Sequence, residues 1–274
     1  MQETDPVTLT PLDPPDLRPE RWLKPHRIVM IAIAVLLIAA AVWFGRWDWL
    51  AEYKGKLWHG LLVTLAMLFS TVILGFILAV PIGLVQVTGP KWLAVPAKVF
   101  CTVIRGTPLL LQLWLLYYGL GSLFPHIPGL RGSFLWPYLR EAWPYGVVAL
   151  TISFAAYEAE VMRGAFAGVP SGELQAGRAF GMSPWKLFRR VWLPRALHRA
   201  LPTLNGETVL QLKSTPLVAT ITVVDLYGVI SRVRSNTLLT YEPLLFLALV
   251  YFLLTVVLVT VFRYFENKIP TKGA

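Results

Sequence analysis

The residues of this chain that could do chemistry are charged side chains inside otherwise apolar segments. Glu158 and Glu160 lie near the end of the apolar segment at about 144–162, and Arg105 interrupts another at about 95–120. A charge at membrane depth is costly, so each is a candidate for binding or transport. The histidines are scattered, and no GxSxG, Walker or GxGxxG pattern occurs. We therefore expect a binding site without a catalytic, metal or cofactor role.

The spacing of Glu158 and Glu160 limits what they can do together. Side chains two residues apart on a helix point about 200° away from each other, so the carboxylates cannot share one face. One interpretation pairs Glu160 with Arg163 at the i,i+3 spacing. The other makes a carboxylate a ligand, and spacing favours neither. For Arg105, just before Pro108, we favour a structural role, in which it satisfies carbonyls freed by the proline, over substrate contact.

A third polar group interrupts the apolar segment at about 204–230, where Glu207, Lys213 and Thr215 are prominent. A helix that is polar and broken at mid-depth must face protein or a water-lined cavity. Glu207 and Lys213 lie on different helix faces, so we expect no ion pair between them. This segment is the best pointer to a translocation path.

Composition indicates an integral membrane protein. The chain has 274 residues, of which 56% are hydrophobic and 15% charged, and its mean hydropathy is +0.60. The net charge of +10 does not indicate nucleic-acid binding, because the cations fall at the ends of apolar runs. Residues 1–27 are rich in proline and charge and predict a disordered cytoplasmic tail.

We predict an all-α protein with several membrane spans. The segment 28–45 is read as a retained span rather than a cleaved signal peptide, because no small-residue cleavage site follows it. The predicted spans are 28–45, 57–87, 95–120, 144–162, 204–230 and 243–262. Lys and Arg concentrate on the side that would place both termini in the cytoplasm.

The basic segment between the fourth and fifth spans, residues 164–202, is called the elbow here. Its sequence predicts a helix from Glu173 to Phe180 ended by Gly181, and a second helix that starts at Ser183. Its apolar residues Leu174, Ala176, Phe180 and Met182 favour insertion into a groove of a partner protein. The alternative is a basic loop that binds lipid.

Ordered motifs between about Trp58 and Asn267 resemble the inner-membrane permease subunits of ATP-binding-cassette importers, specifically the polar amino-acid permeases. The motifs are RGTPLLLQ (105–112), AYEAEVMRGA (156–165), VPSGELQAGRAFGMS (169–183), LPRAL (193–197), LP (201–202) and LKSTPL (212–217). The segment ATITVVDL and the RYFEN end look most like subunits that transport histidine, lysine, arginine, ornithine or opines.

The resemblance implies a MetI-like, five-span core at 57–267, with 28–46 as an extra N-terminal span. It implies a multi-pass protein of the bacterial inner membrane with the elbow as its coupling (EAA) loop. The implied partners are a cytosolic ABC ATPase dimer, a second permease subunit (a paralogue or a copy), an extracytoplasmic solute-binding protein and membrane lipid. The ATPase partner would hydrolyse ATP, and this chain would not be an enzyme.

The resemblance also assigns roles to residues. Glu160 matches an acid in the region that contacts substrate, and Glu158 matches a less constrained position; the predicted substrate-binding residues are these two, Arg105, Glu207 and Thr215. The predicted ATPase-coupling residues are Gly172, Glu173, Gln175, Ala176, Gly177, Phe180 and Gly181. Gln175 and Gly177 depart from the family's glutamate and second alanine.

The resulting prediction is an ATP-driven importer subunit for basic amino acids or opines. Alternatives are an importer for acidic or neutral polar substrates, or a secondary transporter that needs no ATPase. An intramembrane enzyme would need a nucleophile and base, or metal ligands, that converge, and the sequence indicates none.

Overall fold

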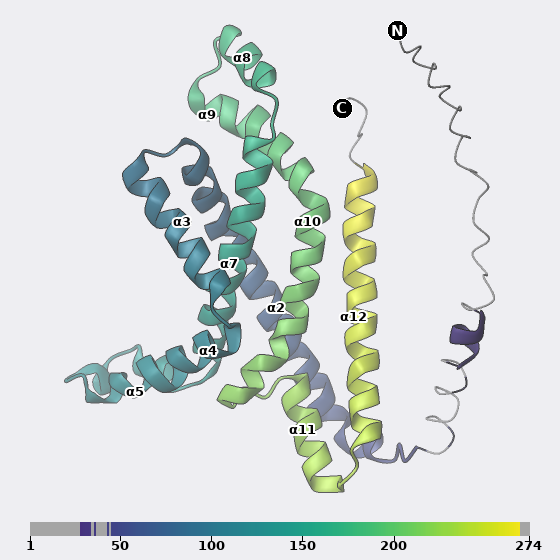
Figure 1. Ribbon diagram of the computed structural model, residues 1–274. Coiled ribbons are helices and arrows are strands. Elements are labelled where there is room, and N and C mark those ends of the chain that lie inside the picture. Colours follow the sequence, from purple (N-terminus) through teal and green to yellow (C-terminus); the bar gives the residue numbers. More distant parts are fainter. Residues whose placement is uncertain (1–27, 34–35, 37–42, 44, 269–274) are drawn as a thin grey trace, which may run out of the picture. The chain divides into compact units, whose positions relative to one another are not determined.

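The computed structural model describes residues 28–33, 36, 43 and 45–268, and the elements it describes are helical (Figure 1). It divides into two compact units, Met1–Arg46 and Trp47–Ala274. In the first unit, residues 28–33, 36 and 43 are helical. The predicted tail 1–27 lies outside the described residues, and the predicted span 28–45 is described only in part.

The second unit is built from long helices joined by short turns. Its α-helices are α2 (Trp49–Thr88), α3 (Lys91–Gly106), α4 (Leu109–Trp114), α5 (Gly121–Leu123), α6 (Trp136–Leu139), α7 (Trp143–Ala167), α8 (Ser171–Ala179), α9 (Pro184–Leu187), α10 (Leu193–Ser214), α11 (Leu226–Thr237) and α12 (Tyr241–Lys268). A π-helical turn, Phe188–Trp192, makes α9 continuous with α10, and a 3₁₀ segment, Thr215–Ile221, follows α10.

Helices α2 and α12 are long and apolar enough to cross a membrane. Two bent pairs also pass that test, which gives up to four spans among the described residues. They are 91–106 with 109–126, bent by 102°, and 184–221 with 226–237, bent by 53°. Helix α7 is not among these candidate spans, because it contains carboxylates and other polar residues. At about 1.5 Å per residue, it is nevertheless long enough to cross the hydrocarbon core.

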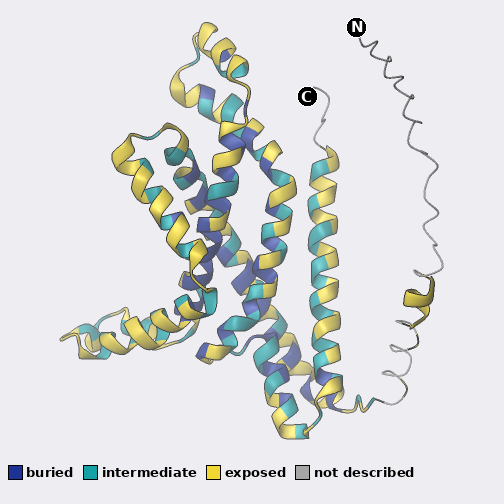
Figure 2. Cartoon of the chain, in the orientation of Figure 1, coloured by how far each residue is buried: buried dark blue, intermediate teal, exposed yellow. Residues whose placement is uncertain are grey.

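The close contact of α2 with α7 forms the centre of the unit (Figure 2). Glycines allow it: a Cβ on Gly75 would lie 2.7 Å from Phe154 Cδ1, and one on Gly83 would lie 2.7 Å from the Ala159 carbonyl oxygen. Small residues let helix backbones approach closely where lipid gives no hydrophobic force between helices. The buried alanines of α7, such as Ala155 and Ala159, serve the same purpose.

The bend after α3 corrects the role predicted for Arg105. Pro108 leaves carbonyls of the preceding turn without their usual donors. Gln112 satisfies them: its Nε2 donates to the carbonyl oxygens of Ile104 (2.8 Å) and Thr107 (3.0 Å). Within the described residues, Arg105 forms an ion pair with a carboxylate instead. The prediction that Arg105 satisfies the freed carbonyls was therefore wrong.

The fifth predicted span is broken, as expected, but its helix begins earlier than position 204. Helix α10 starts at Leu193, because Ala196 and Ala200 are fully packed against the end of α7 in a cluster with Met162 and Phe166. After the 3₁₀ segment, Asp225 begins α11 by accepting a hydrogen bond from the Gly228 backbone N–H at 2.8 Å.

We predict that Gly83→Ala destabilises the protein although alanine is the better helix former. The new Cβ would meet backbone atoms of α7 and force α2 away from it. Overpacking of this kind costs about 1–3 kcal/mol, so the melting temperature in detergent should fall by several degrees. Gly55→Ala is the matched control on α2, because a Cβ there meets nothing within 4 Å. Equal melting temperatures for the two variants would contradict this packing account.

Candidate translocation site and coupling elbow

Glu158 is the most unusual side chain of the site. It is fully buried on α7, and neither carboxylate oxygen has a hydrogen-bond partner among the residues that the structure describes. The acid of Glu207, on α10, acts on it repulsively, and Glu207 itself is half-buried. A buried carboxyl without a partner is costly, so its retention calls for a reason beyond packing.

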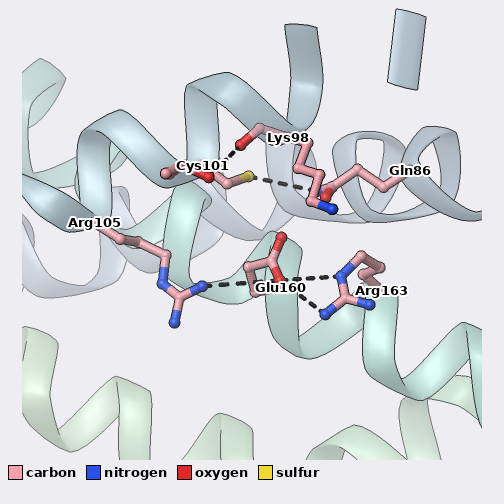
Figure 3. A network of polar contacts seen from close by, with 7 residues as sticks. Gln86, Lys98, Cys101, Arg105, Glu160 and Arg163 are labelled. Atoms are coloured by element: carbon pink, nitrogen blue, oxygen red, sulfur yellow. Dashed lines mark hydrogen bonds and ion pairs between the residues drawn. The ribbon is translucent and has the colours of Figure 1, made fainter. Parts of the chain in front are cut away.

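Glu160, by contrast, is held between two cations (Figure 3). Its Oε2 lies 3.0 Å from Arg163 Nη2 and 3.8 Å from Arg105 Nη1, on α3. The Arg105 guanidinium also lies 5.3 Å from the centre of the Tyr157 ring. The ion-pair interpretation of Glu160 and Arg163 is thereby confirmed. The charge of Glu160 is already balanced by protein.

The structure brings four of the five predicted substrate residues into one region between α3, α7 and α10. Arg105 links Glu160 to this group and also acts electrostatically on Glu207. Thr215 is held by different partners: it is buried, its hydroxyl lies 3.1 Å from the Tyr251 hydroxyl of α12, and it donates to the Leu212 carbonyl.

Sequence reasoning missed a buried polar bridge next to this region. Gln211 Nε2, on α10, donates to Thr71 Oγ1 of α2 (2.9 Å) and to the Leu150 carbonyl oxygen of α7 (3.1 Å). One side chain thus ties three helices at a single level. The available signal was a lone glutamine inside the fifth predicted span, four residues after Glu207 on the same helix face.

The elbow folds as its sequence predicted. Helix α8 ends before Gly181, which has a positive φ of 72°, and the Ser183 side chain caps α9 by accepting from the Lys186 N–H at 3.4 Å. Glu173 Oε2 pairs with Arg195 Nε at 2.8 Å. Helix α8 is therefore tied to the first turn of α10.

The exposed surface of the elbow differs in part from the predicted apolar patch. Phe180 is 85% exposed, and Trp185 of α9 is 66% exposed. Leu174 is half-buried and packs inward on the cluster around Phe166. Of the other predicted coupling residues, Gly172, Gln175, Ala176 and Gly181 are exposed.

Gly177, one of the departures from the family pattern, has a packing explanation. It is buried, and a Cβ there would lie 2.5 Å from a methyl carbon of Leu187. The glycine thus lets α8 lie close on α9. Because the obstacle is the end of a flexible side chain, an alanine would require only a small shift of Leu187.

Broken, apolar helices around a buried carboxylate, joined to a folded elbow, are the arrangement expected of a membrane transport subunit. The family of binding-protein-dependent transport system inner membrane components matches residues 71–270, and the chain belongs to it. It is thus a multi-pass, inner-membrane permease component of a binding-protein-dependent transport system, and it is not the ATPase.

The chain is also similar to curated permease proteins over most of their length. The chain is 37% identical over 207 residues to the octopine transport system permease protein OccM of Rhizobium radiobacter, covering 76% of this chain and 83% of OccM. It is 35% identical over 223 residues to the histidine/lysine/arginine/ornithine transport system permease protein HisM of Salmonella typhimurium, covering 81% of this chain and 93% of HisM.

Solved structures confirm the fold. An amino acid ABC transporter crystallised with histidines superposes with a TM-score of 0.68 at 30% identity, covering 82% of this chain and 99% of that one. A subunit of the MetNI methionine ABC transporter superposes with a TM-score of 0.60 at 18% identity, covering 78% and 97%. The described residues therefore have an all-helical fold similar to that of MetI-type permeases, and the number of spans, a five-span core with one added span, stays a prediction.

We predict that Gln211→Leu destabilises the helix core by about 1–3 kcal/mol, since it removes both hydrogen bonds of the bridge. Thr71→Val removes one partner, so the two changes should be less than additive, with a coupling of about 0.5–3 kcal/mol in a double-mutant cycle of thermal unfolding. Strictly additive effects would show that the hydrogen bond between Gln211 and Thr71 carries no energy. Ser214→Ala, which removes only a bond to the carbonyl in its own preceding turn, is the control.

Proposed function

We propose that this permease carries basic amino acids or opines, and that Glu158 supplies the negative charge that receives their cationic group. The supporting observation is the complete burial of an unpartnered carboxyl on α7. Substrates named for the HisM relative carry cationic side chains, and octopine carries a guanidinium group. A positive ligand group would remove the cost that Glu158 otherwise imposes.

Glu158 suits this role better than Glu160. Arg105 and Arg163 already neutralise Glu160, whereas Glu158 experiences repulsion from another acid, Glu207. The two acids would together favour a cation between α7 and α10. Because Glu158 is covered in this conformation, substrate must enter when α7 and α10 separate during transport.

The same charges weigh against the alternative substrates. An acidic amino acid would meet repulsion from Glu158 and Glu207. A neutral polar amino acid has no cationic side chain, so it would offer the two acids only its α-ammonium group. A secondary transporter would have no use for a folded elbow with Phe180 and Trp185 exposed. We therefore favour the ATP-driven importer of cationic substrates.

The proposed assembly follows the family's dependence on a binding protein. The elbow would sit on one subunit of a cytosolic ABC ATPase dimer, with Phe180 and Ala176 in the contact. A second permease subunit, either a paralogue or a copy of this chain, would complete the path, and an extracytoplasmic solute-binding protein would deliver substrate. This arrangement places the elbow and both termini in the cytoplasm.

We predict that Glu158→Gln lowers arginine and octopine uptake by the assembled transporter in proteoliposomes by about tenfold or more, equivalent to at least about 1.4 kcal/mol. Uptake of a neutral analogue such as citrulline should fall less. Glu160→Gln should change the preference for cationic over neutral substrates little, because the Glu160 carboxylate is already paired with Arg105 and Arg163. Glu52→Gln, an exposed acid in the first turn of α2, is the control. A cation preference lost in Glu160→Gln but kept in Glu158→Gln would assign the role to Glu160.

We predict that Ala176→Asp abolishes uptake because it places a charge in the ATPase contact, while the permease stays in the membrane at its normal level. Affinity purification of the tagged permease should then recover little ATPase. Thr88→Asp is the control, since it changes an exposed residue at the end of α2 nearest the elbow. Uptake that persists without the ATPase would instead support a secondary transporter.

A further inference from the structure

Four aromatic rings connect the exposed surface of the elbow to the end of α7. Trp185, which is 66% exposed, stacks on Phe188 with ring centres 5.7 Å apart and an interplanar angle of 27°. Phe188 lies 6.1 Å from Phe166, and Trp192 meets Phe166 edge to face at 5.5 Å. Phe166 itself is 1% exposed. The rings run from solvent into the core without a gap.

A hydrogen bond fixes the inner end of this stack. Trp192 Nε1–H donates to the Phe166 carbonyl oxygen at 3.0 Å, across 26 residues of chain. The carbonyls in the last turn of a helix have no partner within that helix. The Phe166 carbonyl accepts a long hydrogen bond from the Val169 N–H at 3.4 Å, and Trp192 adds a shorter one from the turn that leads into α10.

The outer end is fixed by the packing of α8. Gly177 is buried against Leu187, and Glu173 pairs with Arg195. A displacement of α8 must therefore move the turn that carries Phe188. That turn is π-helical, a form found often at functional sites.

Helix α7 transmits a displacement along its length. It is unbroken from Trp143 to Ala167, so its end is rigidly connected to Glu158. At 1.5 Å per residue, Phe166 and Glu158 are separated by about 12 Å along the axis. Ala159, next to Glu158, packs on Cys101 of α3 in a small buried cluster. Movement of α7 would loosen that contact.

We propose that Trp185, Phe188, Trp192 and Phe166, here called the aromatic joint, carry movement of the ATPase-docking surface to α7 and the Glu158 site. Phe188 and Trp192 are positioning residues. They act through their contacts with Phe166, so that the end of α7 moves together with α8 and α9. The direction of this movement, from the ATPase to the substrate site, rests on the proposed function. Its geometry is independent of which substrate is carried.

The test uses Cys101, the single cysteine of the chain, as a native reporter beside α7. The assembled transporter is treated with N-ethylmaleimide, without nucleotide and after trapping with ATP and vanadate, and alkylation of the Cys101 peptide is followed by mass spectrometry. In the parent, trapping should change the alkylation rate by about threefold or more, as expected for a shift between two conformations. Phe188→Leu and Trp192→Leu should abolish most of that change.

The controls separate transmission from folding and docking. Trp92→Phe changes an exposed tryptophan of α3 and should respond as the parent does. Trp192→Phe keeps a ring but loses the bond to Phe166, so it should give an intermediate response. The ATPase should co-purify with each variant in the parent's ratio, and melting temperatures should stay within a few degrees.

Three results would overturn the aromatic joint. They are an unchanged nucleotide response in Phe188→Leu, loss of the ATPase from that variant, and a parent whose Cys101 does not respond to trapping. Failure of arginine and octopine uptake in the parent would overturn the proposed substrates alone, because Cys101 alkylation does not depend on the substrate.

Discussion

The cost of a charge in an apolar interior is the constraint on which this structure depends. Two acids of α7, two residues apart, differ in how that cost is treated. Glu160 is neutralised by Arg105 and Arg163, and so ties α3 to α7. Glu158 is buried and has no partner among the described residues. Glu160 is thus held in ion pairs, whereas we propose that Glu158 receives a cationic ligand during transport, and the opposite faces of the helix keep the two carboxylates apart.

Much of the local structure could be predicted from sequence, because its causes are local. Gly181 and Ser183 determine where the elbow helices end and begin, and the Glu160–Arg163 pair follows from helical spacing. The family was likewise evident from motifs. These features need only residues a few positions apart.

What the sequence could not predict depends on contacts between distant segments. Arg105 was expected to satisfy the carbonyls freed by Pro108, but Gln112, on the other side of the bend, donates hydrogen bonds to them instead. The isolation of Glu158 depends on how α10 packs, and the bridge of Gln211 needs three helices in place. Nothing in local spacing shows that Trp192 caps α7 or that Gly177 makes room for Leu187.

The most direct test of the central claim is the structure of the assembled transporter with arginine or octopine bound in the membrane path, determined by electron cryo-microscopy. Our account predicts the guanidinium within hydrogen-bonding distance of the Glu158 carboxylate, while Glu160 stays paired with Arg105 and Arg163. A guanidinium bound to Glu160, with Glu158 still buried and unpartnered, would contradict it.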